Sequence, residues 1–212
     1  MSRSLVRENR PQGSVRGELG NQLSYLDDTL KERSTMTTKK IIDVCCGTKG
    51  MWFDKTDKRV LFLDKRKETH YLKYPSGNYT EIIDPDIIGD FTDIKQLDNS
   101  FYLVVFDPPH IVQKKPTGRI CKKYGVLSGE WKTMLSLGFS ECFRILKING
   151  ILIFKWNECH IKIEEILALT PEKPLFGHKS GKAMKTHWIA FIKMSNKALN
   201  ADGRLQDKPP AG

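Results

Sequence analysis

The feature that most constrains the fold is the alternation of short apolar runs with longer amphipathic stretches. Five apolar runs have the length of a buried strand and are bounded by turn residues, namely 41–45, 60–63, 101–106, 151–156 and 188–193. Residues 129–146 repeat apolar side chains at the i, i+3, i+4, i+7 spacing of an amphipathic helix, and a second helical stretch covers 161–169. Strands and helices that alternate in this way predict an α/β fold with a mainly parallel central sheet.

Glycine and proline predict where the two helices end. Gly150 follows the first helical stretch and is expected to stop that helix, as a C-terminal glycine does. The second stretch ends before Pro171, because a proline disfavours helical conformation in the residue that precedes it.

The length of 212 residues suits one domain with tails. We expect a flexible N-terminal extension at 1–37, one folded domain at 38–195 and a disordered C-terminal tail at 196–212, because both ends are polar. The chain lacks an apolar run near the ~20 residues of a membrane helix, and its first ten residues do not resemble a signal peptide. These observations predict a cytoplasmic protein that does not contact membranes.

The cysteines argue against disulfides and a structural metal site, and the net charge favours one class of partner. Five cysteines without an export signal indicate reduced thiols, and the absence of a C-x-x-C pair argues against a structural metal site. The chain has 35 Lys and Arg against 25 Asp and Glu, a formal net charge of +10. This excess favours a polyanionic partner, although it could also serve solubility alone.

The ends of the first two predicted strands carry the signature of a nucleotide-type site. The first strand runs from Asp43 into a turn that contains Gly47, where the backbone can approach a ligand closely. Asp64 ends the second strand and follows Asp43 by about 20 residues, the interval at which an acidic residue binds ribose hydroxyls in nucleotide-binding folds. The alternative is that Asp64 is an ordinary surface aspartate at a strand end.

The motif after the third apolar run is more specific. Asp107, Pro108, Pro109 and His110 follow a strand, and the two prolines impose an extended turn whose carbonyls stay free to accept hydrogen bonds. With the Asp107 carboxylate, such a turn makes an acceptor-rich clamp for an NH₂ group, and His110 could stack on a planar base. In an arbitrary protein the motif could be only a rigid strand-exit turn.

Together these residues resemble a known family. The chain is similar to class I S-adenosylmethionine-dependent methyltransferases with an Asp-Pro-Pro-aromatic motif, and specifically to short bacterial and prophage methyltransferases. The resemblance covers about 41–194 and rests on Asp43-x-Cys45-Cys46-Gly47, Trp52-Phe53-Asp54-Lys55, Val105-Phe106-Asp107-Pro108-Pro109-His110, Phe154-Lys155-Trp156-Asn157-Glu158 and Lys185-Thr186-His187-Trp188. It implies a Rossmann-like sheet with helices on both faces, and S-adenosylmethionine as the cofactor.

The resemblance also implies roles for individual residues. Asp107, Pro108, Pro109 and His110 would form the active site. The cofactor would be held by the turn after the first strand, by the ribose carboxylate and by the pair that flanks the adenine, that is by Asp43, Cys45, Cys46, Gly47, Asp64, Asp90 and Phe91. The sequence departs from the family where Thr48 and Lys49 follow Gly47 in place of a Gly-x-Gly turn.

Cations and aromatic residues near the motif are candidates for substrate binding. Lys155 and Trp156 close the fourth apolar run at the same edge, where they could contact a base or phosphate, or only snorkel and pack. A basic loop follows the motif and contains Lys114, Lys115, Arg119, Lys122 and Lys123. It suits a phosphate backbone, although it could be a solvated lid over the cofactor.

These features predict methyl transfer to an exocyclic amine of a nucleic-acid base, adenine N6 before cytosine N4. The reaction needs no metal, because the sulfonium already carries an activated methyl group. One alternative keeps the cofactor and changes the substrate to a protein amide or a small molecule. Another is a non-catalytic nucleic-acid-binding module on the same scaffold. The sequence leaves open the choice between DNA and RNA and the oligomeric state.

Overall fold

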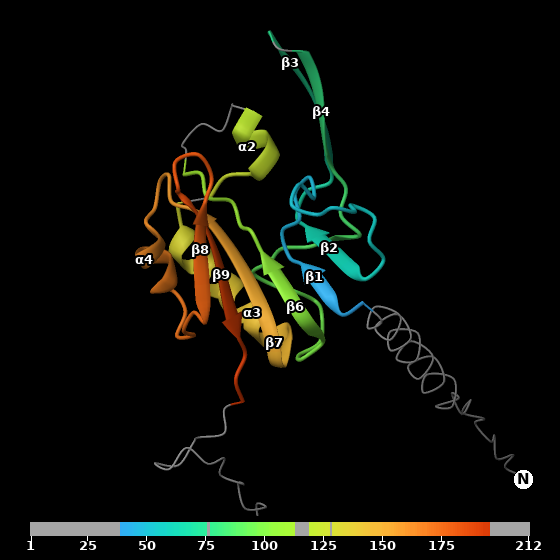
Figure 1. Ribbon diagram of the computed structural model, residues 1–212. Helices are drawn as coiled ribbons and strands as arrows, with labels where there is room; N and C mark the ends of the chain where they lie inside the picture. Colours follow the sequence, from blue (N-terminus) through green and yellow to red (C-terminus); the bar gives the residue numbers. More distant parts are fainter. Residues whose placement is uncertain (1–38, 76, 113–118, 128, 196–212) are drawn as a thin grey trace, which may run out of the picture. The chain divides into compact units, whose positions relative to one another are not determined.

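The computed structural model describes residues 39–75, 77–112, 119–127 and 129–195, all within one compact unit, Lys39–Gly212 (Figure 1). The predicted extension at 1–37 and the predicted tail at 196–212 lie outside the described residues. The strands are β1 (Ile41–Asp43), β2 (Val60–Asp64), β3 (Glu68–Tyr74), β4 (Gly77–Ile83), β5 (Ile87–Ile88), β6 (Phe101–Phe106), β7 (Leu146–Asn157), β8 (Phe176–Ser180) and β9 (Thr186–Ile192). The helices are α2 (Arg119–Tyr124), α3 (Trp131–Ile145) and α4 (Ile163–Leu167).

Seven strands form the central sheet in the order β5-β2-β1-β6-β7-β9-β8. The pairs β5-β2, β2-β1, β1-β6 and β6-β7 are parallel, and β9 runs antiparallel to both β7 and β8. The five parallel strands β5-β2-β1-β6-β7 follow the 3-2-1-4-5 order of a doubly wound sheet. The predicted Rossmann-like, mainly parallel sheet with helices is therefore confirmed.

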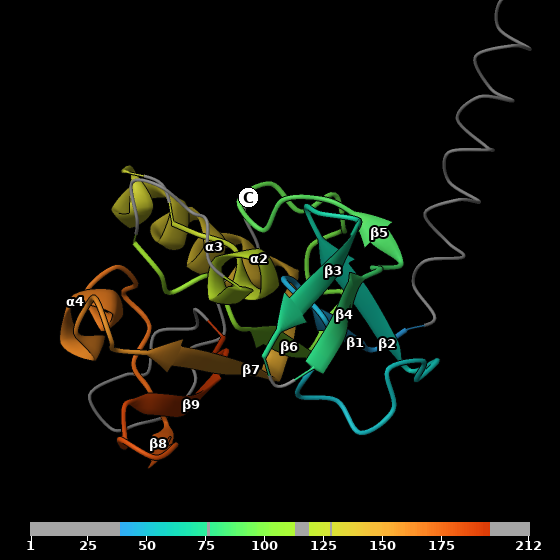
Figure 2. The same ribbon diagram turned by 90° about the horizontal axis from the view of Figure 1, so that it is seen from above.

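The main core lies between this sheet and α3, which packs against β6 and β7 on one side of the sheet (Figure 2). Phe139 of α3 is 1% exposed, and its ring centroid lies 4.8 Å from that of Phe154 and 5.5 Å from that of Phe106. Burying an aromatic side chain of this kind stabilises the fold by about 1.5–3 kcal/mol. The amphipathic pattern in the sequence therefore identified the helix that anchors the sheet.

The connection from β1 to β2, residues 44–59, contains no helix. A small apolar cluster, which includes Trp52 and Phe62, packs here instead of a helix. The Trp52 ring lies edge-on to the Phe62 ring, with 5.4 Å between the two ring centroids. Trp52 also donates a hydrogen bond from Nε1 to Asp43 Oδ2 at 2.7 Å. Side-chain contacts, instead of a helix, hold the loop that follows β1.

The prediction that Gly150 ends the long helix is wrong. The helix α3 ends at Ile145, and Leu146 is already extended, with its N–H donating to the Cys142 carbonyl. Gly150 lies inside β7, where a Cβ atom would come within 2.8 Å of both Leu146 Cδ1 and the Lys147 carbonyl oxygen. Its lack of a side chain permits this close packing at the start of the strand, next to Asn149, which has a φ of 63°.

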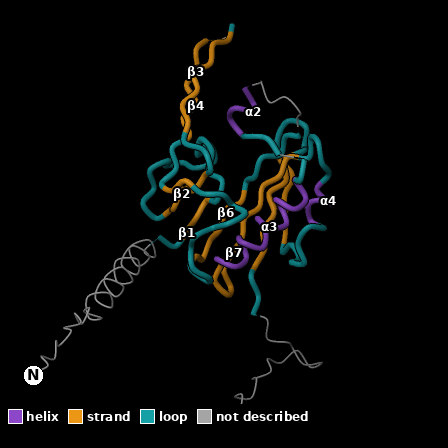
Figure 3. Tube along the Cα trace, turned by 180° about the vertical axis from the view of Figure 1, so that it is seen from behind, coloured by secondary structure: helices purple, strands orange, loops and turns teal. Residues whose placement is uncertain are grey.

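Two strands that the hydrophobic pattern did not predict form the hairpin β3–β4. The hairpin lies between β2 and β5 in the chain, forms its own two-stranded sheet and extends away from the central sheet (Figures 1 and 3). Leu72 and Ile83 are its buried apolar residues, whereas Tyr71 is 80% exposed. The described helices are all too short or too polar to span a membrane.

Candidate functional site

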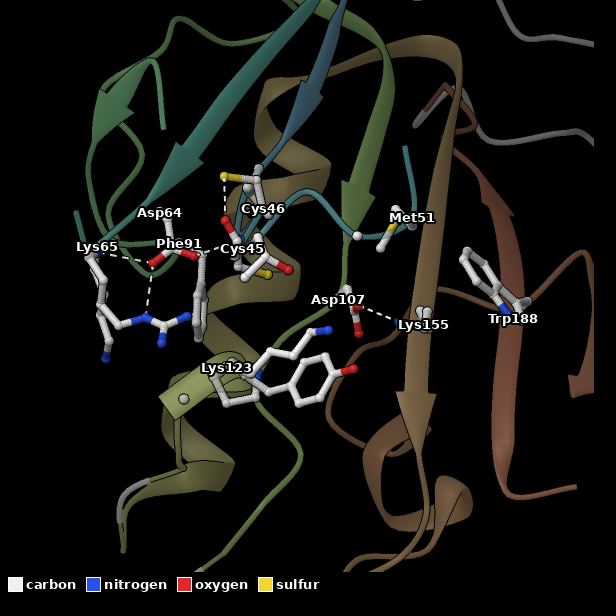
Figure 4. A pocket seen from close by; sticks show the side chains of 18 residues that line it. Cys45, Cys46, Met51, Asp64, Lys65, Phe91, Asp107, Lys123, Lys155 and Trp188 are labelled. Atoms are coloured by element: carbon white, nitrogen blue, oxygen red, sulfur yellow. Dashed lines mark hydrogen bonds and ion pairs between the residues drawn. The ribbon is translucent and has the colours of Figure 1, made fainter. Parts of the chain in front are cut away.

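A cavity of about 280 Å³ lies at the carboxyl ends of β1, β2, β6 and β7, where ligands bind in open α/β sheets (Figure 4). Its volume is near the lower end of the ~300–1,000 Å³ typical of ligand pockets. The side chains and backbone that line it are Val44, Cys45, Cys46, Gly47, Thr48, Gly50, Met51, Asp64, Lys65, Arg66, Phe91, Asp107, Pro109, Lys123, Tyr124, Gly125, Lys155 and Trp188. Some of the predicted strand-end residues, among them Asp64, Asp107 and Lys155, therefore meet in one cavity.

The loop after β1 turns sharply over this cavity. Gly47 and Lys49 have φ values of 50° and 54°, in the left-handed region that glycine tolerates and lysine rarely adopts. The turn is closed by hydrogen bonds from Lys49 N to the Cys46 carbonyl at 2.8 Å and from Cys46 N to the Leu63 carbonyl at 2.9 Å. Lys49 Nζ lies 4.3 Å from the Phe62 ring centroid. The sequence departure after Gly47 is thus accommodated by a lysine in the conformation that a second glycine would adopt.

The Asp64 carboxylate ties this loop to its surroundings. Its Oδ2 accepts a hydrogen bond from Gly47 N at 2.8 Å, and its Oδ1 accepts from Arg66 N at 2.9 Å and from Arg66 Nε at 3.2 Å. The Arg66 guanidinium also donates to the Lys122 carbonyl of α2 at 3.0 Å. A carboxylate offers about four acceptor positions, so about one on Asp64 remains for a ligand.

Asp43 lies beneath the cavity, without lining it. It is fully buried, and it accepts hydrogen bonds from Trp52 Nε1 and from Cys45 N, the latter at 3.3 Å. Burial, with smaller contributions from the charges of Asp107 and Asp64, raises the pKa of Asp43 to about 7 against the lowering effect of its two hydrogen-bond donors. The Asp43 side chain therefore supports the loop after β1 and does not line the cavity, so its predicted contact with a cofactor would be indirect.

Cys45 and Cys46 do line the cavity. Burial raises the pKa of both thiols well above the ordinary value, and the carboxylate of Asp43 adds to the effect. Both side chains are therefore protonated thiols at neutral pH and are poor nucleophiles. They shape the cavity wall and the backbone turn.

The two residues predicted to flank an adenine separate in the structure. Phe91 lines the cavity and is 4% exposed. Asp90 does not line it, because its Oδ1 instead accepts hydrogen bonds from Thr92 N and Thr92 Oγ1, both at 2.9 Å. The Asp90 carboxylate therefore stabilises the turn that presents Phe91, and its contact with a cofactor stays a prediction.

Asp107 lies at the opposite end of the cavity from Asp64 (Figure 4). Its Oδ2 accepts a hydrogen bond from Lys155 Nζ at 2.5 Å, and its side chain is 16% exposed. Its Oδ1 accepts no hydrogen bond from any residue that the structure describes. Burial raises the pKa of Asp107, and the Lys155 ammonium opposes that rise.

The rest of the Asp-Pro-Pro-His motif divides between the cavity and the core. Pro109 lines the cavity and lies close to Gly125, whereas Pro108 is buried and does not line it. The His110 ring lies between Tyr124 and Trp156, at 5.7 and 6.3 Å between centroids. The Pro108 side chain is buried and the His110 ring is half-buried, so neither lines this cavity, and their contact with a ligand stays a prediction.

The environment of His110 keeps its imidazole neutral. Burial lowers the pKa of His110 to about 4, and the charges of Lys155 and His160 add to the effect. The ring therefore carries no charge at physiological pH and acts as a packing partner beneath Tyr124, which does line the cavity.

Of the two residues that close the fourth apolar run, Lys155 lines the cavity and Trp156 packs in the core. Neighbouring side chains on a strand point to opposite faces, so Lys155 and Trp156 of β7 cannot both reach the cavity. Lys155 lines it, whereas Trp156 is fully buried and donates from Nε1 to the Ile161 carbonyl at 3.0 Å. The tryptophan that lines the cavity is Trp188, which pairs with Lys155 across β7 and β9.

The predicted basic loop is part helix. Lys114 and Lys115 lie outside the described residues, and Arg119 begins the helix α2. Lys122 is exposed on that helix, and Lys123 lines the cavity with its Nζ 3.8 Å from Glu81 Oε1 of β4. Of these predicted cations, Lys123 therefore lines the cavity itself.

Several lining residues escaped sequence reasoning, namely Met51, Lys65, Arg66, Tyr124 and Gly125. Lys65 and Arg66 directly follow Asp64, so their place at the end of a strand was a usable signal. Trp188 belongs to a stretch that carries the family resemblance, but its register against Lys155 cannot be read from one sequence. Among the described residues, no group of three or more His, Cys, Asp or Glu side chains is placed to hold a metal ion.

No protein-family model and no curated protein matches the chain. It is similar to solved structures that include a protein of Pyrococcus horikoshii, at 15% identity and a TM-score of 0.49, over 83% of this chain and 91% of that one. A TehB-like SAM-dependent methyltransferase of Corynebacterium glutamicum matches at 13% identity and a TM-score of 0.47, over 84% and 97%. A SAM-dependent methyltransferase of Methanosarcina mazei matches at 12% and 0.44, over 73% and 92%.

Proposed function

We propose that this protein is an S-adenosylmethionine-dependent methyltransferase that acts on an exocyclic amino group of a nucleic-acid base, with adenine N6 favoured. One observation carries the proposal: Asp107, at the start of a Pro-Pro turn, lines the same cavity as Asp64 and the Gly47 loop, and one of its oxygens has no hydrogen-bond partner among the described residues. A ligand held at the Asp64 end would share the cavity with an amine held at the Asp107 end.

The residues at the Asp64 end suit the proposed cofactor. The remaining acceptor position on Asp64 would take a ribose hydroxyl, the Phe91 ring would lie against the adenine, and the backbone from Cys45 to Gly47 would surround the methionine part. Dinucleotide sites instead place a pyrophosphate on the helix that follows the first strand. Residues 44–59 contain no helix, so this cavity lacks that phosphate site.

The residues at the Asp107 end suit an amine acceptor. When bound, S-adenosylmethionine supplies an activated methyl group. Asp107 Oδ1 would accept a hydrogen bond from the target N–H, orient the nitrogen lone pair and stabilise the positive charge that develops on that nitrogen. Burial raises the pKa of Asp107 and so favours its uptake of the departing proton, while the Lys155 ammonium opposes that rise by favouring the carboxylate.

Cations around the cavity support a nucleic-acid substrate. Lys65 and Lys122 are exposed on one side, and Lys182 and Lys185 are exposed in the segment between β8 and β9. The second of these groups precedes Trp188, which lines the cavity. Cations on two sides of an active site suit the phosphates that flank a target base.

Calorimetric titration with S-adenosylmethionine and S-adenosylhomocysteine tests the cofactor. We expect micromolar binding, about −8 kcal/mol, that Asp64→Ala weakens and that the exposed-site control Asp93→Ala leaves unchanged. Absence of binding to the folded wild-type protein would overturn the proposal.

Transfer of a labelled methyl group to single-stranded and duplex DNA and RNA tests the substrate. We expect the apparent affinity for nucleic acid to fall steeply with salt, and substituting Lys182 and Lys185 with glutamine to reduce that slope. Lys95→Gln, at an exposed site away from the cavity, is the matched control. Turnover of an amide or small molecule without salt dependence would favour the alternative substrates, and cofactor binding without any turnover would favour a non-catalytic module.

A further inference from the structure

Asp107, Lys155 and Trp188 form a row across three neighbouring strands of the sheet. Phe106 of β6 pairs with Phe154 of β7, so the next residues, Asp107 and Lys155, lie side by side. Lys155 pairs in turn with Trp188 of β9. All three side chains line the cavity at the end away from Asp64 (Figure 4).

The ammonium group of Lys155 is held from two sides within this row. Its Nζ donates to Asp107 Oδ2 and lies 5.4 Å from the Trp188 ring centroid, where a cation is attracted by the ring. An ammonium has three N–H donors, and among the described residues Nζ makes no hydrogen bond other than that to Asp107. The side chain is 23% exposed, so a ligand that displaced water from it would need to supply an acceptor.

The row therefore presents a free acceptor beside a free donor. Asp107 Oδ1 can accept from an N–H, and the Lys155 ammonium next to it can donate to an acceptor atom of the same ligand. This pattern complements an amino group on a carbon that also carries a ring nitrogen, which is the amidine edge of adenine at N6 and N1 and of cytosine at N4 and N3. An isolated aliphatic amine offers nothing to the lysine.

We propose that Lys155 is a specificity-determining residue that reads the ring nitrogen beside the target amine, so that the substrate is a base with an amidine edge. This inference rests on the proposed methyl transfer to a base. Trp188 holds the ammonium in position, and Asp107 binds the amine itself. The site then rejects a ligand that lacks the ring acceptor, because the partly buried ammonium would lose its partner.

A pair of matched substrates tests the role of Lys155. The first pair is a single-stranded oligonucleotide with one adenine and the same oligonucleotide with 1-deazaadenine, in which C–H replaces the ring nitrogen. Cytosine and 3-deazacytosine form the second pair. We expect wild-type protein to prefer the natural base by about 10- to 100-fold in kcat/KM, as for loss of a hydrogen bond to a charged group.

Substitution of Lys155 separates this role from a structural one. Lys155→Met keeps the length of the side chain and removes the donors, and it should methylate the natural base and its deaza analogue at equal kcat/KM, whereas Lys155→Arg should retain a preference. The readout is the ratio between two substrates within one variant, so a general loss of activity or stability does not alter it. The wild-type ratio alone is informative if Lys155→Met does not fold.

The outcomes distinguish failure of this inference from failure of the proposed function. Equal activity of the wild-type protein on both members of a pair, or a preference that persists in Lys155→Met, would overturn the role of Lys155 and leave the methyltransferase proposal standing. Methyl transfer to neither base, with bound cofactor, would overturn the base as substrate. Transfer to a glutamine-containing peptide instead would mean that Asp107 and Lys155 bind the NH₂ group and the carbonyl of an amide, and it would overturn the base as substrate.

Discussion

The two ends of the cavity use the same chemical group in opposite ways. At one end, Asp64 accepts three hydrogen bonds, one from Gly47 and two from Arg66, so most of its capacity is spent on the protein itself. At the other end, Asp107 has a single described partner, Lys155, and one oxygen that faces no protein donor. A saturated carboxylate stabilises a loop, whereas an unsaturated one is available to a ligand. Substitutions should therefore damage the two ends differently.

The largest effect is expected at the unsaturated end. Asp107→Ala should lower kcat/KM for methyl transfer by about 10²- to 10³-fold, the usual loss when a group that stabilises developing charge is removed. Cofactor affinity should change little, because Asp107 lies away from the Asp64 end. Kinetics with labelled cofactor and calorimetry on the same samples measure both quantities. Full activity of Asp107→Ala would remove its proposed role.

At the saturated end, one substitution should affect affinity and stability together. Asp64→Ala removes an acceptor from Gly47 N–H and from the half-buried Arg66, and an unsatisfied buried donor costs about 1–3 kcal/mol. We expect a lower midpoint of denaturant unfolding as well as about 10- to 100-fold weaker cofactor binding. Asp107→Ala serves as the comparison. An equal loss of stability in both variants would contradict the claim that Asp64 stabilises the fold more than Asp107 does.

A substitution in the core should also weaken cofactor binding at the Asp64 end of the cavity. A Cβ atom on Gly138 of α3 would lie 2.7 Å from Phe106 Cζ and 2.8 Å from Phe91 Cδ2. Gly138→Ala should therefore destabilise the fold by about 1–3 kcal/mol through overpacking, and displacement of Phe91 should weaken cofactor binding. Gly129→Ala, where a Cβ atom would meet nothing within 4 Å, is the control. A stable Gly138→Ala protein with normal affinity would contradict this coupling.

The smallest effect concerns Asp43, whose charge interacts with both Asp64 and Asp107. Its pKa is raised to about 7 in the folded protein from an ordinary value of 3.8. The folded state then binds more protons than the unfolded state, so Asp43 contributes stability at low pH that is lost as the pH rises through about 7. The loss between pH 6 and 8 should be about 1 kcal/mol.

Asp43→Asn should remove this pH dependence, because the amide oxygen still accepts from Trp52 and does not titrate. Thermal unfolding of both proteins across that range measures the difference. The lowered pKa of His110 acts in the opposite sense, adding stability as the pH rises from about 4 to about 6.5, but it is present in both proteins and cancels. Parallel pH profiles for the two proteins would mean that Asp43 is ionised throughout.

The sequence predicted the parts of the fold whose side chains are buried. Packing requires apolar side chains in the buried strands and on the buried face of α3. A single sequence therefore shows these patterns, which cover β1, β2, β6, β7, β9 and α3. The hairpin β3–β4 and the edge strand β8 were missed, because most of their residues are exposed and carry little hydrophobic periodicity. Gly150 was misread because a glycine after a helix usually ends it, whereas here close packing within β7 requires it.

The sequence predicted which strand ends form the candidate site, and the structure showed which side chains at those ends point into the cavity. Asp64, Phe91, Asp107 and Lys155 meet in the cavity as expected from the parallel sheet. Asp43 and Trp156 at the same edge are buried, Asp90 bonds within its own turn, and the half-buried His110 packs between Tyr124 and Trp156. Strand order can be inferred from sequence, whereas the face that each loop residue presents depends on contacts such as that of Trp52 with Asp43.

The central position of β1 has a consequence for how the chain folds. β1 is the first described strand, yet it is completed on one side only when Ile41 pairs with Leu103 of β6, far along the chain. Pairings of such large sequence separation form slowly, since a long loop must be closed before they contribute. During synthesis the edge of β1 therefore waits unpaired until β6 has emerged. The local unit β6-α3-β7 is the natural place for folding to begin, and it already contains Asp107 and its partner Lys155. The Asp64 end of the cavity is completed only when β1 and β2 dock onto this unit.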